Sequence, residues 1–257
     1  MTLRDRNVLI TGAGSGLGRG LALALAQAGH RVFVTDRDGD AAGQSLDLIS
    51  SAGKSASAHV LDVTSDESVR SFLAGLGGQR VDVLINNAGL QHVARLEEFP
   101  QDRWDALIDV MLAGACRVSR AVLPIMRRHG FGRIINIGSI HSLVASPFKS
   151  AYVAAKHGLL GLAKVLALET ADVDVTVNTI CPAYIRTPLV EAQITSQARV
   201  HGIPEQEVID RIMLAPMPKR RFITVEEVAA AVAYLSSDAA RNVTGQCLVI
   251  DGGWTIQ

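Results

Sequence analysis

Residues 8–18 read Val-Leu-Ile-Thr-Gly-Ala-Gly-Ser-Gly-Leu-Gly, a short apolar run that ends in four closely spaced glycines. The next apolar residues, Leu17, Leu21, Leu25 and Ala28, recur at intervals of four and three, which is the period of a helix with one buried face. The stretch therefore predicts a strand, a glycine-rich turn and a helix. Glycines at such a turn let the backbone approach a pyrophosphate, whose charge lies at the helix N-terminus. The alternative is a tight turn that simply needs glycine.

The same alternation of strand and helix continues along the chain. The strands are continuously apolar, which is typical of a parallel sheet covered by helices on both faces. We therefore predict an α/β fold: one Rossmann-type, doubly wound parallel sheet of about seven strands, in a single domain over residues 1–257. Further strands are expected at 31–36, 59–61, 81–85, 133–137, 174–181 and 246–250, and further helices at 40–52, from 65 onward and at 101–128, 150–171 and 225–236. Residues 183–223 contain several prolines and no strand pattern, so we expect an irregular, mobile flap over the active site there.

The composition excludes several classes of protein. The 257 residues are 48% hydrophobic and 19% charged, with 25 basic and 25 acidic side chains, which argues against disorder and against nucleic-acid binding. No apolar run reaches the roughly 18 residues that cross a bilayer, and the N-terminus lacks a signal-peptide pattern, so no membrane partner is expected. The cysteines, Cys116, Cys181 and Cys247, are an odd, widely spaced set, as in a reduced cytoplasmic protein. The histidines show no metal-ligand spacing, so no metal site is expected.

Asp36 lies at the end of the second predicted strand, about 20 residues after the glycines. A carboxylate there accepts hydrogen bonds from an adenosine ribose diol and repels a 2′-phosphate, which favours NAD over NADP. Arg37, the next residue, would instead tolerate that phosphate. On its own Asp36 also fits an exposed acid at a strand end.

Ser139, Tyr152 and Lys156 form a second candidate group. Tyr152 and Lys156 are four residues apart on a predicted helix and so share a face. An ammonium held close to a phenol is expected to lower its pKa from near 10 toward the working range of an acid/base group. Ser139 follows a strand, at the edge where open α/β sheets bind ligands. Tyrosine and lysine at this spacing are otherwise an ordinary surface pair.

Taken together, these motifs resemble the short-chain dehydrogenase/reductase family over the full length of the chain. The matching elements are Gly12-x3-Gly16-x-Gly18, Asn86-Asn87-Ala88-Gly89, Ser139, Tyr152-x3-Lys156 and Asp251-Gly252-Gly253. The resemblance implies hydride transfer between a nicotinamide and a carbonyl or alcohol carbon. Tyr152 would exchange the proton, Lys156 would tune Tyr152 and bind the nicotinamide ribose, and Ser139 would hold the substrate oxygen. The other NAD-binding residues it implies are Gly12, Ser15, Gly16, Leu17, Gly18, Asp36, Asp62, Val63, Asn87, Ile185 and Thr187.

Within that family the chain is most similar to the bacterial D-3-hydroxybutyrate dehydrogenases. The stretches that carry this similarity are 86–92, 143–158, 187–193 and 252–255. The similarity implies that Gln91, His141, Lys149 and Gln193 bind the substrate carboxylate beside Ser139 and Tyr152, and that the protein is a homotetramer. A small hydroxy acid can be oriented by one lysine and several neutral donors. The expected reaction is the reversible, NAD-dependent oxidation of (R)-3-hydroxybutyrate to acetoacetate. Taken singly, each of these side chains also fits a surface or structural role.

Three residues depart from the pattern. Met111 stands where the family usually has an asparagine that supports a proton-relay water, Ala183 replaces a glycine, and Tyr184 stands where the hydroxybutyrate enzymes commonly have tryptophan. A thioether offers only weak acceptor capacity to a relay. Two alternatives therefore stay open: an NAD(P)-dependent enzyme for another small 3-hydroxy or 3-oxo acid, and a non-catalytic dinucleotide sensor. The retained Ser139, Tyr152 and Lys156 favour an enzyme.

Overall fold

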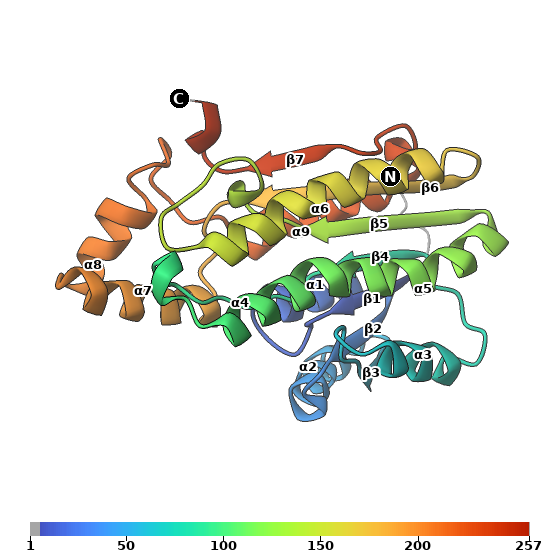
Figure 1. Cartoon of the computed structure of the whole chain (residues 1–257). Coiled ribbons are helices and arrows are strands. Elements are labelled where there is room, and N and C mark those ends of the chain that lie inside the picture. The colour runs from blue at the N-terminus through green and yellow to red at the C-terminus, as the bar shows by residue number, and fades with distance from the viewer. Residues whose placement is uncertain (1–5, 257) are drawn as a thin grey trace.

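An all-parallel sheet forms the centre of the protein (Figure 1). The structure is a computed structural model, and it describes residues 6–256 apart from the side chain of Val200. Its seven strands follow the order β3-β2-β1-β4-β5-β6-β7, which confirms the predicted Rossmann-type α/β fold. Strand order reverses between β1 and β4, and ligands of such sheets bind in the crevice outside the carboxyl ends at that point. The strands are β1 (Asn7–Thr11), β2 (Arg31–Asp36), β3 (Ala56–Val60), β4 (Val83–Asn86), β5 (Phe131–Ile137), β6 (Asp174–Pro182) and β7 (Cys247–Ile250).

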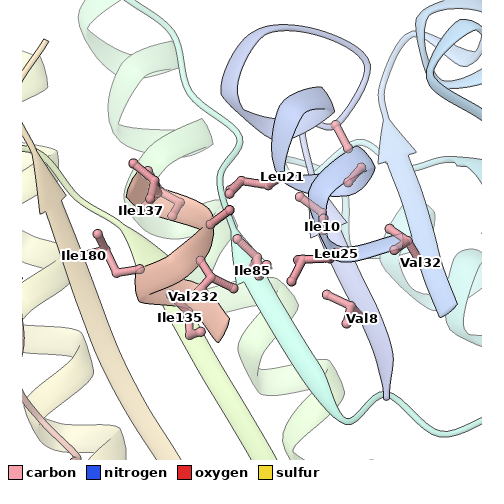
Figure 2. Packing of buried hydrophobic residues seen from close by; sticks show 14 of the residues in the cluster. Val8, Ile10, Leu21, Leu25, Val32, Ile85, Ile135, Ile137, Ile180 and Val232 are labelled. Carbon is pink, nitrogen blue, oxygen red and sulfur yellow. The ribbon is translucent and has the colours of Figure 1, made fainter. Parts of the chain in front are cut away.

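Helices cover both faces of the sheet. Helices α1 (Gly16–Gln27), α2 (Gly39–Ser51) and α9 (Val225–Ser236) lie on one face, and α3 (Asp66–Gly75), α5 (Gly114–His129) and α6 (Ser150–Glu169) on the other. Figure 2 shows the apolar core on the first of these faces, where side chains of α1 and α9 meet those of the central strands. Because the strands are buried on both sides, their apolar runs do not alternate with polar residues. The remaining short helical turns are η1 (Leu96–Glu98), η3 (Ile140–Ser142), η5 (Asp238–Ala240) and η6 (Trp254–Ile256).

The helical region predicted over 101–128 is confirmed, although one segment of it is not α-helical. The structure has α4 (Gln101–Ile108), then a π-helical segment, η2 (Asp109–Ala113), and only then α5. A π-helical turn adds a residue to the turn and shifts the side chains that follow, and such turns occur frequently at functional sites. The segment contains Met111, so one of the departures lies at an irregularity of the backbone.

The irregular stretch expected over 183–223 is wrong, because much of this segment is helical. The segment contains α7 (Pro188–His201), α8 (Glu205–Glu207) and a second π-helical segment, η4 (Val208–Met213). Pro188 does not break α7 but begins it, at the position where its missing N–H is unneeded, and Thr187 is the N-cap. Figure 1 shows α7 and α8 beyond the carboxyl ends of the strands. Helix α7 and the π-helical segment η4 share an apolar cluster that includes Val190, Ile194, Val208 and Met213. Motion of the whole segment stays a prediction.

One helix among residues 6–256, α6, is long and apolar enough to cross a membrane by length and composition alone. This result differs from the simple count of uninterrupted apolar residues in the sequence. Helix α6 lies against β6 and η3 and contains Tyr152 and Lys156. Of its apolar window 33% is buried, so α6 packs on the sheet along one face and leaves the other face exposed.

Candidate active site

A cavity of about 470 Å³ opens at the carboxyl ends of the central strands. Every residue predicted to bind the dinucleotide or the substrate lines it, although these residues come from widely separated parts of the chain. The dinucleotide set comprises Gly12, Ser15, Gly16, Leu17, Gly18, Asp36, Asp62, Val63, Asn87, Ile185 and Thr187. The catalytic and substrate set comprises Gln91, Ser139, His141, Lys149, Tyr152, Lys156 and Gln193. The fold thus brings the two sets together in one continuous space.

Two glycines of the glycine-rich turn lie so close to neighbouring backbone atoms that no side chain fits at their positions. A Cβ atom on Gly12 would lie 2.8 Å from the Cα of Ala88, and one on Gly18 would collide with the carbonyl oxygen of Gly12. Gly12 and Gly16 also have positive φ angles of 63° and 53°. Ser15 is the N-cap of α1, yet its side chain makes no capping hydrogen bond. The first N–H groups of α1 are therefore available to a phosphate, so the turn fits a dinucleotide.

Asn87 anchors this turn. Its Nδ2 donates to the carbonyl oxygens of Thr11 (2.9 Å) and Gly12 (3.0 Å). Thr11 Oγ1 in turn accepts from the backbone N–H groups of Asn87 (3.0 Å) and Ala88 (3.1 Å). The side-chain nitrogen of Asn87 is thus used to hold the turn, and only its oxygen is left for the ribose contact that the family resemblance implies.

Two carboxylates lie at the end of the cavity where the family resemblance would place the adenosine. Asp36 accepts hydrogen bonds from the backbone N–H groups of Gly14 (3.0 Å) and Asp38 (3.1 Å), so its position is fixed. Asp62 accepts from both the N–H (2.8 Å) and the hydroxyl (2.7 Å) of Thr64, and the hydrogen bond from the hydroxyl is the main cause of its lowered pKa. Arg37 lines the cavity as well. The adenosine end is therefore bounded by fixed negative charge with one cation nearby.

The catalytic candidates meet where β5 ends. Ser139 is the N-cap of η3, and its Oγ accepts from the N–H of His141 (3.2 Å), so its hydroxyl can still donate a hydrogen bond. Lys156 Nζ donates to the carbonyl oxygen of Ile137 (2.6 Å) and lies 5.5 Å from the ring centroid of Tyr152. Tyr152 and Lys156 thus share a face of α6, as their spacing predicts.

The pKa of Tyr152 differs from the sequence prediction. The spacing predicts that Lys156 lowers the pKa of Tyr152, but burial raises the pKa of this phenol and a hydrogen bond with Ser139 only partly offsets that effect. Burial also lowers the pKa of Lys156 to about 8. Desolvation disfavours the charged form of each group. Formation of a phenolate on Tyr152 therefore depends on the positive charge and hydrogen bonds placed around it.

A buried cation, Lys149, lines the cavity where the family resemblance would place the substrate. Lys149 is only 4% exposed, and its Nζ lies 3.1 Å from Tyr184 Oη and 3.4 Å from His141 Nε2. No carboxylate among the described residues forms an ion pair with it. Burial lowers the pKa of Lys149 to about 8, and burial followed by the charge of Lys149 lowers the pKa of His141 to about 3. His141 is therefore neutral, and because an ammonium only donates, Nε2 is its acceptor.

The two glutamines line the same cavity. Gln193, on α7, is 8% exposed, and its buried Oε1 has no partner within the described part of the chain. Gln91 Oε1 accepts from the N–H of His92 (3.2 Å). Each side chain retains amide N–H groups that can donate to a ligand. No group of three or more His, Cys, Asp or Glu side chains within residues 6–256 is arranged to hold a metal ion.

Three further aromatic residues lie at or beside the site, and of these only Tyr184 lines the cavity. Trp254 packs against His141 and Tyr184, each at a distance of 5.9 Å between ring centroids. Tyr184 contacts Lys149 directly. Phe148 has a left-handed backbone (φ 68°), which is uncommon for a bulky side chain, immediately before Lys149. The aromatic residues are visible in the sequence, but only folding brings positions 141, 184 and 254 together.

Comparisons with known proteins agree with this geometry. Residues 12–255 match the family described as Enoyl-(Acyl carrier protein) reductase. The chain is 50% identical to D-beta-hydroxybutyrate dehydrogenase of Rhizobium meliloti over 201 residues, which is 77% of this chain and 78% of the relative. It is 47% identical to the enzyme of the same name from Cupriavidus necator over 192 residues, 75% and 74% of the two chains. Among solved structures, a single-residue variant of actinorhodin polyketide ketoreductase with NADPH gives a TM-score of 0.93 at 34% identity, with 99% of each chain covered.

Proposed function

The chain belongs to the short-chain dehydrogenase/reductase family and is an oxidoreductase that acts on CH–OH groups, and from that premise we propose that it reversibly oxidises (R)-3-hydroxybutyrate to acetoacetate with NAD. Support for the substrate comes from the pocket and from two relatives that carry the name D-beta-hydroxybutyrate dehydrogenase. Support for NAD comes from Asp36.

The observation that carries the proposal is Lys149. A buried ammonium without a carboxylate partner is costly, because desolvation disfavours its charge and its partners in the described part of the chain, Tyr184 and His141, are neutral. An anionic ligand would supply that compensation. Lys149 lines the same cavity as Tyr152 and Ser139. A substrate with a carboxylate at one end and a reacting hydroxyl a short distance away therefore fits better than a neutral alcohol.

In the proposed mechanism Tyr152 removes the proton from the substrate hydroxyl as the hydride leaves the same carbon. The bound nicotinamide supplies the hydride acceptor, and at its ribose end Lys156 is the expected ligand. Ser139 donates a hydrogen bond from its hydroxyl to the substrate oxygen and holds it beside Tyr152. The ammonium of Lys156 stabilises the phenolate that burial alone would disfavour. In the reverse direction Tyr152 returns the proton to the carbonyl oxygen.

The cofactor proposal is based on charge. A 2′-phosphate would lie close to the fixed carboxylate of Asp36, and like charges at such a distance repel in a partly enclosed site. Arg37 is the nearest feature that favours the phosphate. We propose that Asp36 dominates, because two backbone N–H groups hold it in place at the cavity wall.

A second candidate is an enzyme for another small 3-hydroxy or 3-oxo acid. Tyr184 favours it, because this residue contacts the carboxylate-binding lysine and differs from the tryptophan common in the hydroxybutyrate enzymes. The two candidates share the mechanism and the need for an acid group, and the second leaves the choice between NAD and NADP open. They differ in the preferred length and shape of the substrate.

A panel of small hydroxy acids separates these candidates. The purified protein is incubated with NAD and with each acid of the panel, and NADH formation is followed by absorbance. We expect the highest kcat/KM with (R)-3-hydroxybutyrate, little activity with its (S) enantiomer, and none in the Tyr152→Phe variant. A clear preference for another acid would support the second candidate. No turnover of any acid, with NAD still bound, would favour a dinucleotide sensor.

A further inference from the structure

Tyr184 lies between the carboxylate-binding lysine and the aromatic wall of the pocket. It follows β6 closely, and its side chain is half-buried. Its hydroxyl oxygen is 3.1 Å from Lys149 Nζ, and its ring packs at a tilt of 35° against Trp254. It also lines the cavity that contains Ser139 and Tyr152. The side chain is therefore fixed on two sides and faces the substrate space on a third.

The hydrogen-bond roles at this contact follow from the chemistry of the two groups. An ammonium has three donors and no acceptor, so Tyr184 Oη must accept from Lys149. A phenol has one proton of its own to donate. No acceptor for that proton is found among the described residues. Burial raises the pKa of Tyr184 to about 12, so the hydroxyl keeps its proton at any working pH.

We propose that Tyr184 is a further substrate-binding residue, whose hydroxyl donates to the same acid group that Lys149 binds. This inference rests on the proposed function as far as the acid is a hydroxybutyrate, and otherwise requires only a carboxylate. Lys149 and Tyr184 together then present an ammonium and a phenol O–H to one anion. The hydrogen bond between them orients both donors before the substrate arrives.

The tryptophan common in related enzymes cannot make this arrangement. An indole N–H donates but does not accept, so it cannot receive a hydrogen bond from Lys149. Tyrosine does both and keeps a ring that packs against Trp254. The substitution therefore changes how the lysine is held as well as which donors face the acid.

The test is the Tyr184→Phe variant, which removes only the hydroxyl oxygen of this side chain. In Tyr184→Phe we expect kcat/KM for (R)-3-hydroxybutyrate to fall by about 10–150-fold, the range for a lost hydrogen bond to a charged group. The efficiency with methyl 3-hydroxybutyrate, which has no charge, should change by less than about threefold, and KM for NAD should stay constant. Tyr234→Phe, an exposed tyrosine on α9, is the matched control. Equal losses with the acid and the ester would overturn the proposal.

A second arm separates donation to the substrate from orientation of Lys149 alone. Acetate, with acetamide as its neutral counterpart, is titrated into the NAD-loaded protein and followed by the fluorescence of Trp254 in a Trp104→Phe background. We expect Tyr184→Phe to weaken acetate binding both in the parent protein and in Lys149→Ala. If the effect vanishes in Lys149→Ala, Tyr184 acts only through the lysine and the proposal is wrong. Acetate binding does not depend on turnover, so failure to oxidise hydroxybutyrate would count against the proposed function and leave this test intact.

Discussion

Burial moves the pKa values of Lys149, Lys156 and Tyr184 in the directions that desolvation requires. Both ammonium groups fall to about 8, and the phenol of Tyr184 rises to about 12. At neutral pH the substrate end therefore presents one positive charge and neutral hydrogen-bond donors. Lys156 affects every substrate alike, whereas Lys149 should distinguish acids from neutral analogues.

The first prediction concerns pH. The lowered pKa of Lys149 means that its charge is present below about pH 8 and is lost above it. The groups that face it, His141 and Tyr184, do not titrate in that window, because the pKa values are about 3 and about 12. The ratio of kcat/KM for the acid to that for its methyl ester should therefore be flat from about pH 6 to 8 and then fall by up to about tenfold per pH unit. Dividing by the ester cancels the titration of Lys156 and Tyr152. A ratio that stays level to about pH 10 would show that Lys149 does not bind the acid as an ammonium.

The second prediction concerns Asp36. Replacing it by Asn keeps the shape and removes the charge, so the preference for NAD over NADP should narrow by about 30–150-fold, which corresponds to about 2–3 kcal/mol of repulsion. Asp36→Ala should narrow it as well but should also weaken NAD binding, because Gly14 and Asp38 lose their acceptor. The measurement is kcat/KM for each dinucleotide at saturating substrate. Equal efficiency with NAD and NADP in the unmodified protein would already contradict the assignment.

At the scale of elements, the sequence predicts regular structure better than irregular structure. The strands are predictable because burial on both faces makes them continuously apolar, and α3 because Ser65 caps it, accepting from the N–H of Ser68. The π-helical segment η2 is not, since one extra residue in a turn leaves no signature in an apolar period. The helices in 183–223 escape prediction because a proline ordinarily signals a break, whereas Pro188 is the first residue of α7.

The third prediction concerns Met111 in η2. Its side chain is 2% exposed and lines the cavity beside Lys156. If it replaces a relay group, Met111→Asn should leave kcat unchanged or raise it by up to about 100-fold, the lower end for a positioned proton-transfer group. KM for NAD should not rise. Met126→Leu, a buried methionine of α5 away from the cavity, controls for repacking. A steep loss of activity with intact folding would show that the thioether shapes the pocket.

At the scale of the whole molecule, the site combines segments that are far apart in the sequence, and this limits what sequence can reveal. Motif spacing identifies Tyr152 and Lys156, because the two share one helix. Lys149 contacts His141 and Tyr184, and Trp254 packs on the rings of the same two residues. These contacts depend on how η3, the start of α6, the segment after β6 and the C-terminal η6 assemble. No periodicity encodes such contacts.

The fourth prediction is the oligomeric state. The family resemblance leads us to propose a homotetramer, and the outer face of α6 exposes Val165 and Leu168, which are 53% and 80% accessible in the single chain. Light scattering coupled to size exclusion should give four times the 27.3 kDa mass of the chain. Leu168→Glu should reduce that mass if α6 lies in an interface. A monomer at micromolar concentration would contradict the proposal.

The central claim is that Lys149 selects a small hydroxy acid, and Lys149→Ala tests it most directly. We predict that kcat/KM for (R)-3-hydroxybutyrate falls by about 10–150-fold, as expected for a lost ionic hydrogen bond, while methyl 3-hydroxybutyrate and NAD binding are almost unaffected. Lys164→Ala, on the exposed side of α6, is the control and should change neither. If the ester loses as much as the acid, Lys149 is structural. If the unmodified protein prefers the ester, the substrate is not a small hydroxy acid.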